Sequence, residues 1–385
     1  MFKGSFELIR QEQVSYGDPV ADALPALLPK ADDARVIVVT ARSLADAPET
    51  RALIDALGPA CPLHFSGVRE HAPFSSIAEL IAAIGEIRPH DILVIGGGSA
   101  IDTTKVALIC SAAGITAPAD MPGFAARTLS GELDDLTFPC RYTVVPTTLS
   151  GAEFGVIGAG VDEKTKIKTG FRSKWFPARH VHYDPYLARR TPEWLWLSTG
   201  VRAIDHAVET ILSANPNPYA SALAAEALPL LFASLEKTKA DAEDLEARQN
   251  AQFGVWLAAV GIGRVLYGAS HGIGHQLGAV SGVAHGHTSC VLLPAVMEYN
   301  AEVVGDRFGP IASALGCTNA DDAPEALRAF LKRIGMPTTL KDVDVDPADY
   351  PKIADLSLAN LFVKANPRPI TDAPQVLEIL DRASG

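Results

Sequence analysis

The sequence predicts an α/β N-terminal domain, built on a doubly wound parallel sheet, followed by an all-helical C-terminal domain. Three observations predict this. Short β-branched apolar runs alternate with helical segments in the first half, a glycine turn joins one of these runs to a helix, and strand-like runs almost vanish after about Pro185. The 385 residues exceed what one ordinary core accommodates, and we expect domains at 1–187 and 188–385.

The first elements are read from hydrophobic patterning. Residues 14–28 predict a strand, a turn and a helix. The run Ala34–Thr40, ARVIVVT, is too apolar to face water and predicts a buried parallel strand. A helix is expected from Leu44, and CPLHFSGV predicts the next strand. A further helix is expected from His71, with the Ser75–Ser76 pair as its cap.

The segment DILVIGGGSAIDTTKVAL, residues 91–108, predicts a buried strand, a tight turn and a helix. Gly96, Gly97 and Gly98 lack a Cβ, so the backbone there can approach a ligand closely. The free N–H groups and the dipole at the following helix N-terminus suit a phosphate. The turn fits neither common nucleotide fingerprint, and such turns often bind nothing. A pyrophosphate is the ligand we favour.

Two threonines follow the next predicted strand, RYTVVP. Thr147 and Thr148 are expected at the carboxyl end of the sheet, where ligands bind, although a role as helix caps is equally compatible with the sequence. The basic stretch 164–177 predicts either a solvated hairpin or a lysine that points toward a phosphate or ribose.

Residues 197–212 predict a helix of the second domain, capped by Ser198 or Thr199. On this helix Arg202 and His206 are four residues apart and share a face, while Asp205 lies about 100° away from it.

Four of the ten histidines fall in the segment HGIGHQLGAVSGVAHGH, residues 271–287. His271 and His275 share one helical face, and His285 follows a glycine-containing turn. Imidazole titrates near neutral pH and is the commonest metal ligand. The cluster therefore predicts a metal site, a proton-transfer site or both, against the alternative of ordinary surface or core histidines.

Composition excludes several function classes. The net charge is −12 and there is no block of lysine and arginine, so neither nucleic acid nor an anionic membrane is an expected partner. We find no apolar run of about 18 residues and no export signal. The five cysteines never show CxxC spacing, which predicts reduced thiols and a cytoplasmic location.

Several motifs together resemble the iron-containing (type III) alcohol dehydrogenase superfamily: GGGSAIDTTK, PTTLSGAE, GVRAIDHAVE, HGIGHQLG, AHGHTSCVLLP and NPRP, in the family's order. The resemblance implies a dinucleotide-binding domain, a helical domain, an active site in the cleft between them, and hydride transfer with NADH or NADPH. It also implies a homodimer or larger homo-oligomer.

The metal ligands of that family are one Asp and three His. His206, His271 and His285 match the three His, but Arg202 stands at the Asp position. A guanidinium cannot ligate a cation and repels it. We therefore predict no metal, although three neutral His bind zinc in other folds.

The short threonine loop, the KTG at 168–170 and His71-Ala72-Pro73 are similar to maleylacetate reductases. That branch implies a metal-independent reductase of a C=C bond conjugated to carbonyl and carboxylate groups. Arg202 departs from the Asn of that branch, so the substrate is set only as a small carbonyl or oxo acid. The alternatives are a metal-dependent alcohol dehydrogenase, a dehydroquinate synthase-like lyase, and a non-enzymatic dinucleotide binder.

Expected roles follow from the resemblance. His275 is the candidate proton donor, and Arg202 with His206, His271 and His285 faces the negative charge that develops on the substrate. The alternative for Arg202 is a structural pair with Glu209 or Asp205. Arg42 lies where NAD-preferring relatives carry an Asp, which permits NADPH. The residues expected at the cofactor are Gly97, Gly98, Ser99, Asp102, Thr147, Thr148, Lys168 and Arg42.

Overall fold

The computed structural model describes residues 5–8, 10–26, 28 and 33–385. The chain forms two compact units, residues 8–191 and residues 5–7 with 192–385. The boundary after Thr191 differs slightly from the one expected at residue 187, and the first few described residues belong with the helical part.

The first unit carries a parallel six-stranded sheet in the order β1-β8-β5-β4-β2-β3 and a two-stranded antiparallel hairpin, β6–β7. Its described strands are β1 Gln13–Tyr16, β2 Val36–Ala41, β3 Leu63–Val68, β4 Asp91–Gly96, β5 Arg141–Pro146, β6 Ile157–Val161, β7 Lys168–Arg172 and β8 His180–Tyr183. Its helices are α1 Val20–Ala23, α2 Pro48–Leu57, α3 Phe74–Ile87, α4 Gly98–Ala113, α5 Met121–Leu129 and α6 Pro185–Ala188.

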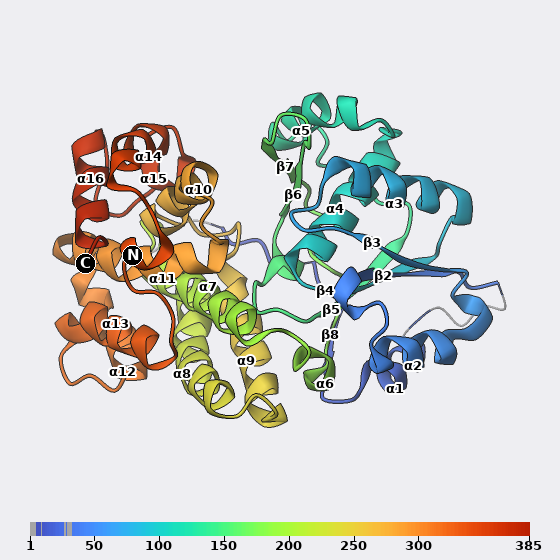
Figure 1. Ribbon diagram of the computed structural model, residues 1–385, viewed down its shortest axis with the longest axis horizontal. Coiled ribbons are helices and arrows are strands. Elements are labelled where there is room, and N and C mark those ends of the chain that lie inside the picture. The colour runs from blue at the N-terminus through green and yellow to red at the C-terminus, as the bar shows by residue number, and fades with distance from the viewer. Residues whose placement is uncertain (1–4, 9, 27, 29–32) are drawn as a thin grey trace. The chain divides into compact units, whose positions relative to one another are not determined.

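Helices cover both faces of this sheet, with α3 and α4 on one side and α1, α2 and α6 on the other (Figure 1). Strands β2 and β4 are buried along their whole length except for the last residue of β2, because neither face of a doubly wound sheet meets water. On the α1/α2 face, alternate residues of these strands pack with the helices in one core. The predicted α/β class is thereby confirmed.

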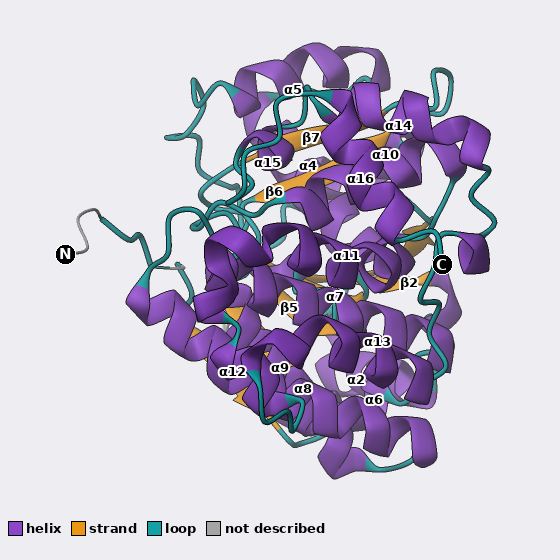
Figure 2. Cartoon of the chain, turned by 90° about the vertical axis from the view of Figure 1, so that its left-hand side faces the viewer, coloured by secondary structure: helices purple, strands orange, loops and turns teal. Residues whose placement is uncertain are grey.

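The second unit consists of helices and loops throughout residues 192–385, all of which are described (Figure 2). Its helices are α7 Glu193–Leu212, α8 Pro218–Ala240, α9 Leu245–Ala258, α10 Ala269–Ser281, α11 His285–Val304, α12 Gly309–Ala314, α13 Ala323–Arg333, α14 Tyr350–Ser357, α15 Leu361–Lys364 and α16 Ala373–Arg382. Helices α10, α11, α14 and α16 share one buried apolar cluster.

Three predicted helix starts were wrong, each displaced to a proline. Instead of a helix from Leu44, a single 3-10 turn precedes α2, which begins at Pro48. Helix α3 begins after Pro73, and α7 begins after Pro192. Proline has the fixed φ of a helix start and lacks an N–H that a helix start leaves unused, so it outweighs a nearby hydroxyl as a start signal.

The serines and threonine predicted as caps therefore lie inside helices. Thr199 Oγ1 donates to the carbonyl of Leu195 within α7, at 2.7 Å, rather than capping it. Ser76 Oγ donates to the carbonyl of Gly67 at 2.6 Å, which ties α3 to the end of β3.

One described helix, α8, is long and apolar enough to cross a membrane, and α4 with residues 118–129 passes the same test as a bent pair. Many core helices of globular proteins pass it as well. Helix α8 buries Ala224, Leu228 and Leu231 within its own unit, and α4 is almost wholly buried. All five cysteines are unpaired in the structure.

Candidate active site

Three helices of the second unit, α7, α10 and α11, bring the predicted histidines together. Glycines let these helices approach closely: a Cβ on Gly286 would lie 2.6 Å from Ser198 of α7, and one on Gly272 would lie 2.5 Å from Val363 of α15. The glycines that punctuate HGIGHQLG and AHGH are therefore packing positions as well as turn residues.

His206 of α7 and His271 of α10 meet directly. His271 Nε2 lies 3.0 Å from His206 Nδ1, and the two ring centroids are 4.8 Å apart. Both side chains are buried, and Tyr267 stacks on His206 with centroids 5.4 Å apart. The structure thus places two of the predicted site residues in direct contact.

A carboxylate that sequence reasoning did not assign to the site orients His271. Glu209 Oε2 lies 2.6 Å from His271 Nδ1, and Glu209 Oε1 accepts the backbone N–H of Ser270 at 3.1 Å. Burial raises the pKa of Glu209 to about 7, against the lowering effect of backbone N–H donors. Burial lowers the pKa of His271, and the nearby Arg202 lowers it further. The neutral ring, held by Glu209, turns Nε2 toward His206.

Asp205 is the second missed carboxylate. Its Oδ2 accepts from Ser289 Oγ at 2.6 Å, from Ser270 Oγ at 2.9 Å and from Arg202 Nη1 at 3.4 Å. Its Oδ1 is buried and has no hydrogen-bond partner among the described residues. Burial raises the pKa of Asp205, while His271 and Arg202 lower it. The sequence predicts that Asp205 points away from the face of α7 that carries Arg202 and His206. Because α7 is buried on nearly every face, the Asp205 side chain instead contacts α10 and α11.

Arg202 is held in place by two neighbours. Nη1 donates to Ser289 Oγ at 2.9 Å and forms an ion pair with Asp205 at 3.4 Å, and the side chain is 13% exposed. Of the structural pairs considered from the sequence, the one with Asp205 is present. The Arg202 guanidinium is therefore a fixed positive charge at the position where the family that the sequence resembles carries a metal-binding Asp.

His275 and His285 lie beside this group, with ring centroids 6.2 Å apart. His275 packs on Phe362 and accepts a long hydrogen bond from Asn360 Nδ2, at 3.5 Å. Both histidines act electrostatically on His271, so the four predicted imidazoles share one site. His287, the last histidine of the cluster in sequence, instead packs against Trp194.

Among the described residues, Asp205, Glu209 and His271 offer ligand atoms within 4.8 Å of one another. The chemistry fits a cation poorly. His271 Nδ1 is already engaged by Glu209 at 2.6 Å, His271 Nε2 is engaged by His206, and a guanidinium lies against Asp205. The family's ligand set lacks its carboxylate at residue 202, so we assign no step to a metal.

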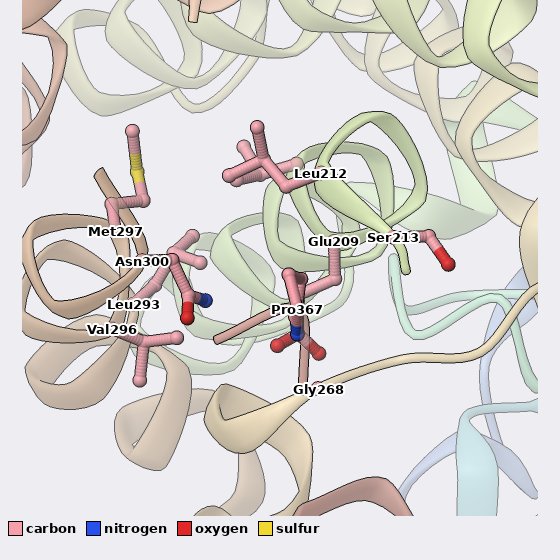
Figure 3. Close-up of a pocket in the computed structure, with 10 residues that line it drawn as sticks. Glu209, Leu212, Ser213, Gly268, Leu293, Val296, Met297, Asn300 and Pro367 are labelled. Atoms are coloured by element: carbon pink, nitrogen blue, oxygen red, sulfur yellow. The ribbon is translucent and has the colours of Figure 1, made fainter. Parts of the chain in front are cut away.

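Behind Glu209 is a cavity of about 10 Å³, roughly the room for one water molecule (Figure 3). Figure 3 shows Glu209 and Leu212 of α7 on one side of it and Val296, Met297 and Asn300 of α11 on another. A polar carboxylate thus borders an otherwise largely apolar space.

The predicted cofactor residues gather at the carboxyl ends of β4 and β5 in the first unit. A Cβ on Gly97 would lie 2.6 Å from Thr148 Cγ2, and Thr147 N donates to the carbonyl of Gly96 at 3.1 Å. Helix α4 begins at Gly98 without a side-chain cap. The glycine turn therefore presents bare backbone beside two threonines, as a phosphate-binding turn requires.

The remaining predicted cofactor residues surround this turn. Ser99 Oγ accepts the backbone N–H of His71 at 3.1 Å. Burial raises the pKa of Asp102, and Lys105 and Lys168 lower it. Lys168 lies exposed on the β6–β7 hairpin, which agrees with the alternative that this basic stretch forms a solvated hairpin. It is also close enough to Asp102 to lower the pKa of that carboxyl group. Arg42 is exposed directly after β2, the strand next to β4.

Lys105 and Glu153 were missed as functional candidates. Lys105 is fully buried, and its Nζ donates to the carbonyls of Ala152 and Gly155 at 2.6 and 2.7 Å. This fixes the loop that continues from Thr148. Burial lowers the pKa of Lys105 to about 8 and raises that of Glu153 to about 7. The available signal was a lysine three residues after Asp102, directly before the apolar run at residues 106–110.

Comparison with known proteins identifies the family. The profile of iron-containing alcohol dehydrogenase matches residues 11–185, and that of the C-terminal part of the Fe-containing alcohol dehydrogenase family matches residues 196–384. Dehydrogenase ALT3 of Alternaria alternata is 32% identical, over 91% of this chain and 98% of that protein. Maleylacetate reductase 1 of Cupriavidus pinatubonensis is 27% identical, over 95% and 93%.

A solved structure agrees with these matches. The crystal structure of maleylacetate reductase from Rhizobium sp. strain MTP-10005 superposes with a TM-score of 0.80 at 26% identity, covering 99% of each chain. The chain therefore belongs to the iron-containing alcohol dehydrogenase family, in its maleylacetate reductase-like branch, and is an NAD(P)-dependent oxidoreductase.

Proposed function

We propose that the enzyme reduces a small oxo acid of the maleylacetate type with NADH or NADPH, without a metal ion. The observation that carries the proposal is Arg202, a cation fixed by Asp205 and Ser289 at the position where the family carries a metal-binding carboxylate. The maleylacetate reductases among its relatives support the substrate class.

The cofactor-binding part of the proposal rests on the glycine turn. Backbone N–H groups of Gly97, Gly98 and Ser99 receive the pyrophosphate at the start of α4. Thr147, Thr148, Asp102 and Lys168 line the nicotinamide-ribose side, and Arg42 accommodates a ribose 2′-phosphate. When bound, the nicotinamide supplies a hydride.

The helical unit handles the charge that hydride transfer creates. Addition of hydride to a carbon conjugated to a carbonyl group moves an electron pair onto the substrate oxygen. Arg202 stabilises that oxyanion and also suits a substrate carboxylate, because a guanidinium binds carboxylates with two parallel N–H groups. His275 donates the proton that completes the reduction. Burial and Arg202 keep His271 neutral, and Glu209 orients its ring in the same pocket.

The test is NAD(P)H oxidation at 340 nm by chelator-dialysed enzyme, with metal content measured on the same sample. We expect turnover of maleylacetate-type oxo acids at less than one-tenth equivalent of bound metal, with no gain on adding Fe²⁺ or Zn²⁺. Activity that disappears with metal and returns with it would refute metal independence.

The metal-dependent alternative has one observation in its favour, the grouping of Asp205, Glu209 and His271 within 4.8 Å. Under that alternative, aldehydes and simple alcohols would be turned over only by metal-loaded enzyme. A lyase of the dehydroquinate synthase type would give no net change in absorbance at 340 nm. We also propose a homodimer in the cytoplasm, in keeping with the expectation from sequence.

A further inference from the structure

The proposed reaction gives no role to the NPRP segment, residues 366–369, which lies between α15 and α16. Its first residue, Asn366, is buried, with 5% of its surface exposed. Burying an amide side chain costs free energy unless its oxygen and its N–H groups are hydrogen-bonded. Here Oδ1 accepts two hydrogen bonds and Nδ2 donates two. Asn366 therefore connects several parts of the helical unit, and the identity of those parts indicates what it does.

On one side, the NPRP segment is bound to α11. Asn366 Nδ2 donates to Asn300 Oδ1 at 2.7 Å, and Asn300 Nδ2 donates back to Asn366 Oδ1 at 3.2 Å. Asn366 Nδ2 also donates to the carbonyl of Arg368 at 2.7 Å. Arg368 Nη1 in turn donates to the carbonyl of Tyr299 at 2.9 Å, and its Cζ lies 4.2 Å from the centroid of the Tyr299 ring. The segment is thus fixed to α11 at residues 299 and 300.

On the other side, Asn366 holds the start of α10. This helix begins at Ala269, and the residue before it, Gly268, has no side chain with which to cap it. The first N–H groups of a helix have no partner within the helix. Asn366 Oδ1 accepts the N–H of Ala269 at 3.0 Å, and Glu209 Oε1 accepts the N–H of Ser270 at 3.1 Å. Two side chains that are distant in the sequence therefore cap α10.

Gly268 allows both caps to approach the same point. A Cβ on Gly268 would lie 2.7 Å from Asn366 Oδ1 and 3.1 Å from Glu209 Oε1, so a larger residue would displace one or both oxygens. Figure 3 shows Gly268 and Glu209 close to Pro367, the residue that follows Asn366, with Asn300 on the same small cavity. The positions of Asn366 and Glu209 are thus coupled through the first turn of α10.

We propose that Asn366 is a positioning residue, which fixes the start of α10 to α11 so that Glu209 and His206 meet His271. His271 is the third residue of α10, and its Nδ1 and Nε2 lie 2.6 Å from Glu209 Oε2 and 3.0 Å from His206 Nδ1. Hydrogen bonds weaken steeply when distance or angle changes, so a displaced first turn of α10 breaks this chain of contacts. The inference rests on the proposed function, in which the histidine group takes part in the reduction.

Asn366→Ala in the full-length protein tests the inference, because it leaves the N–H of Ala269 without its acceptor. We expect faster hydrogen exchange at the start of α10, measured by mass spectrometry on peptides that cover residues 269–275. We also expect kcat to fall about 10- to 100-fold, as for other partners that orient catalytic histidines. KM for NADH and NADPH should stay within about twofold of wild type, a split that a general loss of folded protein does not produce.

Asp244→Ala is the matched control, since it removes the cap of another helix in the same unit. Asp244 Oδ1 accepts the N–H of Ala247 at 2.9 Å at the start of α9. Loss of a cap should lower the midpoint of urea unfolding in both variants, but only Asn366→Ala should lower kcat. An equal loss of kcat in the two variants would reduce Asn366 to a stabilising residue and overturn the inference.

Asn300→Ala tests whether the amide pair is the link to α11. It removes the partner of Asn366 on α11 and should also lower kcat and speed exchange at residues 269–275. The double variant should be no worse than Asn366→Ala alone, because the two amides act on one connection. Fully additive losses would show that the amides act separately, which contradicts the proposal.

The exchange measurement separates this inference from the proposed function. If the wild-type enzyme reduces no oxo acid, the proposed function fails, and exchange at the start of α10 still decides whether Asn366 holds that turn. Unchanged exchange at residues 269–275 in Asn366→Ala would overturn the inference, whatever the substrate. Faster exchange together with unchanged kcat would overturn it as well, because the position of α10 would then not matter to the reaction.

Discussion

Arg202 Nη1 lies 3.4 Å from Asp205 Oδ2, one helical turn along α7, and both groups contact the hydroxyl of Ser289. A guanidinium, a hydroxyl and a carboxylate thus form one connected, mostly buried unit beside the histidine pair. Removing one partner of such a pair leaves the other charge without compensation. A substitution in this unit therefore costs more folding stability than a substitution in an exposed ion pair does.

Arg202→Asp should exchange a fixed cation for a metal ligand. In the metal-free variant we expect kcat to fall about 10²- to 10³-fold, the usual cost of losing one oxyanion-stabilising group, because the positive charge of Arg202 is gone. The variant should also gain a zinc or iron equivalent, since the new carboxylate together with His206, His271 and His285 recreates the family's ligand set. Elemental analysis after dialysis against Zn²⁺ measures this.

Arg202→Lys is the matched control for that change, because it keeps the charge and loses the planar fork. It should retain more activity than Arg202→Asp and bind no metal. Full activity in Arg202→Asp without bound metal would contradict a catalytic role for the guanidinium.

Glu209→Gln tests whether this carboxylate positions His271. The amide cannot hold the His271 Nδ1–H as a carboxylate does at 2.6 Å, so we expect kcat to fall about 10- to 100-fold, the range seen for partners that orient ligating or catalytic histidines. The dissociation constant for NADH, measured by fluorescence, should stay within about twofold of wild type. Glu226→Gln, an exposed change on α8, serves as control. A changed NADH affinity with unchanged kcat would be the contrary result.

Glu153→Gln should alter the pH dependence of stability. Burial raises the Glu153 pKa from 4.5 to about 7 in the folded state. The folded chain therefore holds the proton of Glu153 more tightly than the unfolded chain does. The stabilisation that protonated Glu153 provides is fully present below about pH 4.5 and is lost as the pH rises through 7. At about 1.4 kcal/mol per pKa unit, the variant should exceed wild type by up to about 3 kcal/mol at pH 8 and match it near pH 4.

Urea unfolding at both pH values measures that difference, with exposed Glu86→Gln as control. A stability gain that is the same at pH 4 and pH 8 would show that packing, rather than titration of Glu153, is responsible.

Arg42→Asp should change cofactor preference. The exposed arginine follows β2, and a carboxylate there repels a 2′-phosphate and accepts from a 2′-hydroxyl. We expect KM for NADPH to rise roughly tenfold, equivalent to about 1.4 kcal/mol, with KM for NADH unchanged or lower. Initial rates with both cofactors give the answer, and parallel rises in the two KM values would exclude a role for Arg42 in the choice.

The parts of the fold that depend on burial were predictable from sequence. Strands such as β2 and β4 are apolar because both their faces are covered, and the run 34–40 showed this directly. Helix starts were less predictable, because Pro48, Pro73 and Pro192 competed with polar residues that also mark starts.

Site residues could be predicted where they recur at helical spacing along one face of a helix. They could not be predicted where the contacts that define them are made between different helices. His271 and His275 are visible at helical spacing, but Asp205 points away from the site when its own helix is considered alone. Its partners, Ser270 and Ser289, come from α10 and α11. No periodicity within one segment reports such contacts, so the two carboxylates of the site required three-dimensional information.

Strand β1, the first of the sheet unit, pairs in parallel with β8, the last. The chain thus enters and leaves this unit at neighbouring strands, between residues 5–7 and 192–385 of the helical unit. In topological terms the nucleotide-binding unit is an insertion into the sequence of the helical unit. During translation, residues 8–191 are therefore synthesised before most of the helical unit. Experiments that exchange residues 8–191 between relatives would place their junctions at the boundaries between the two units.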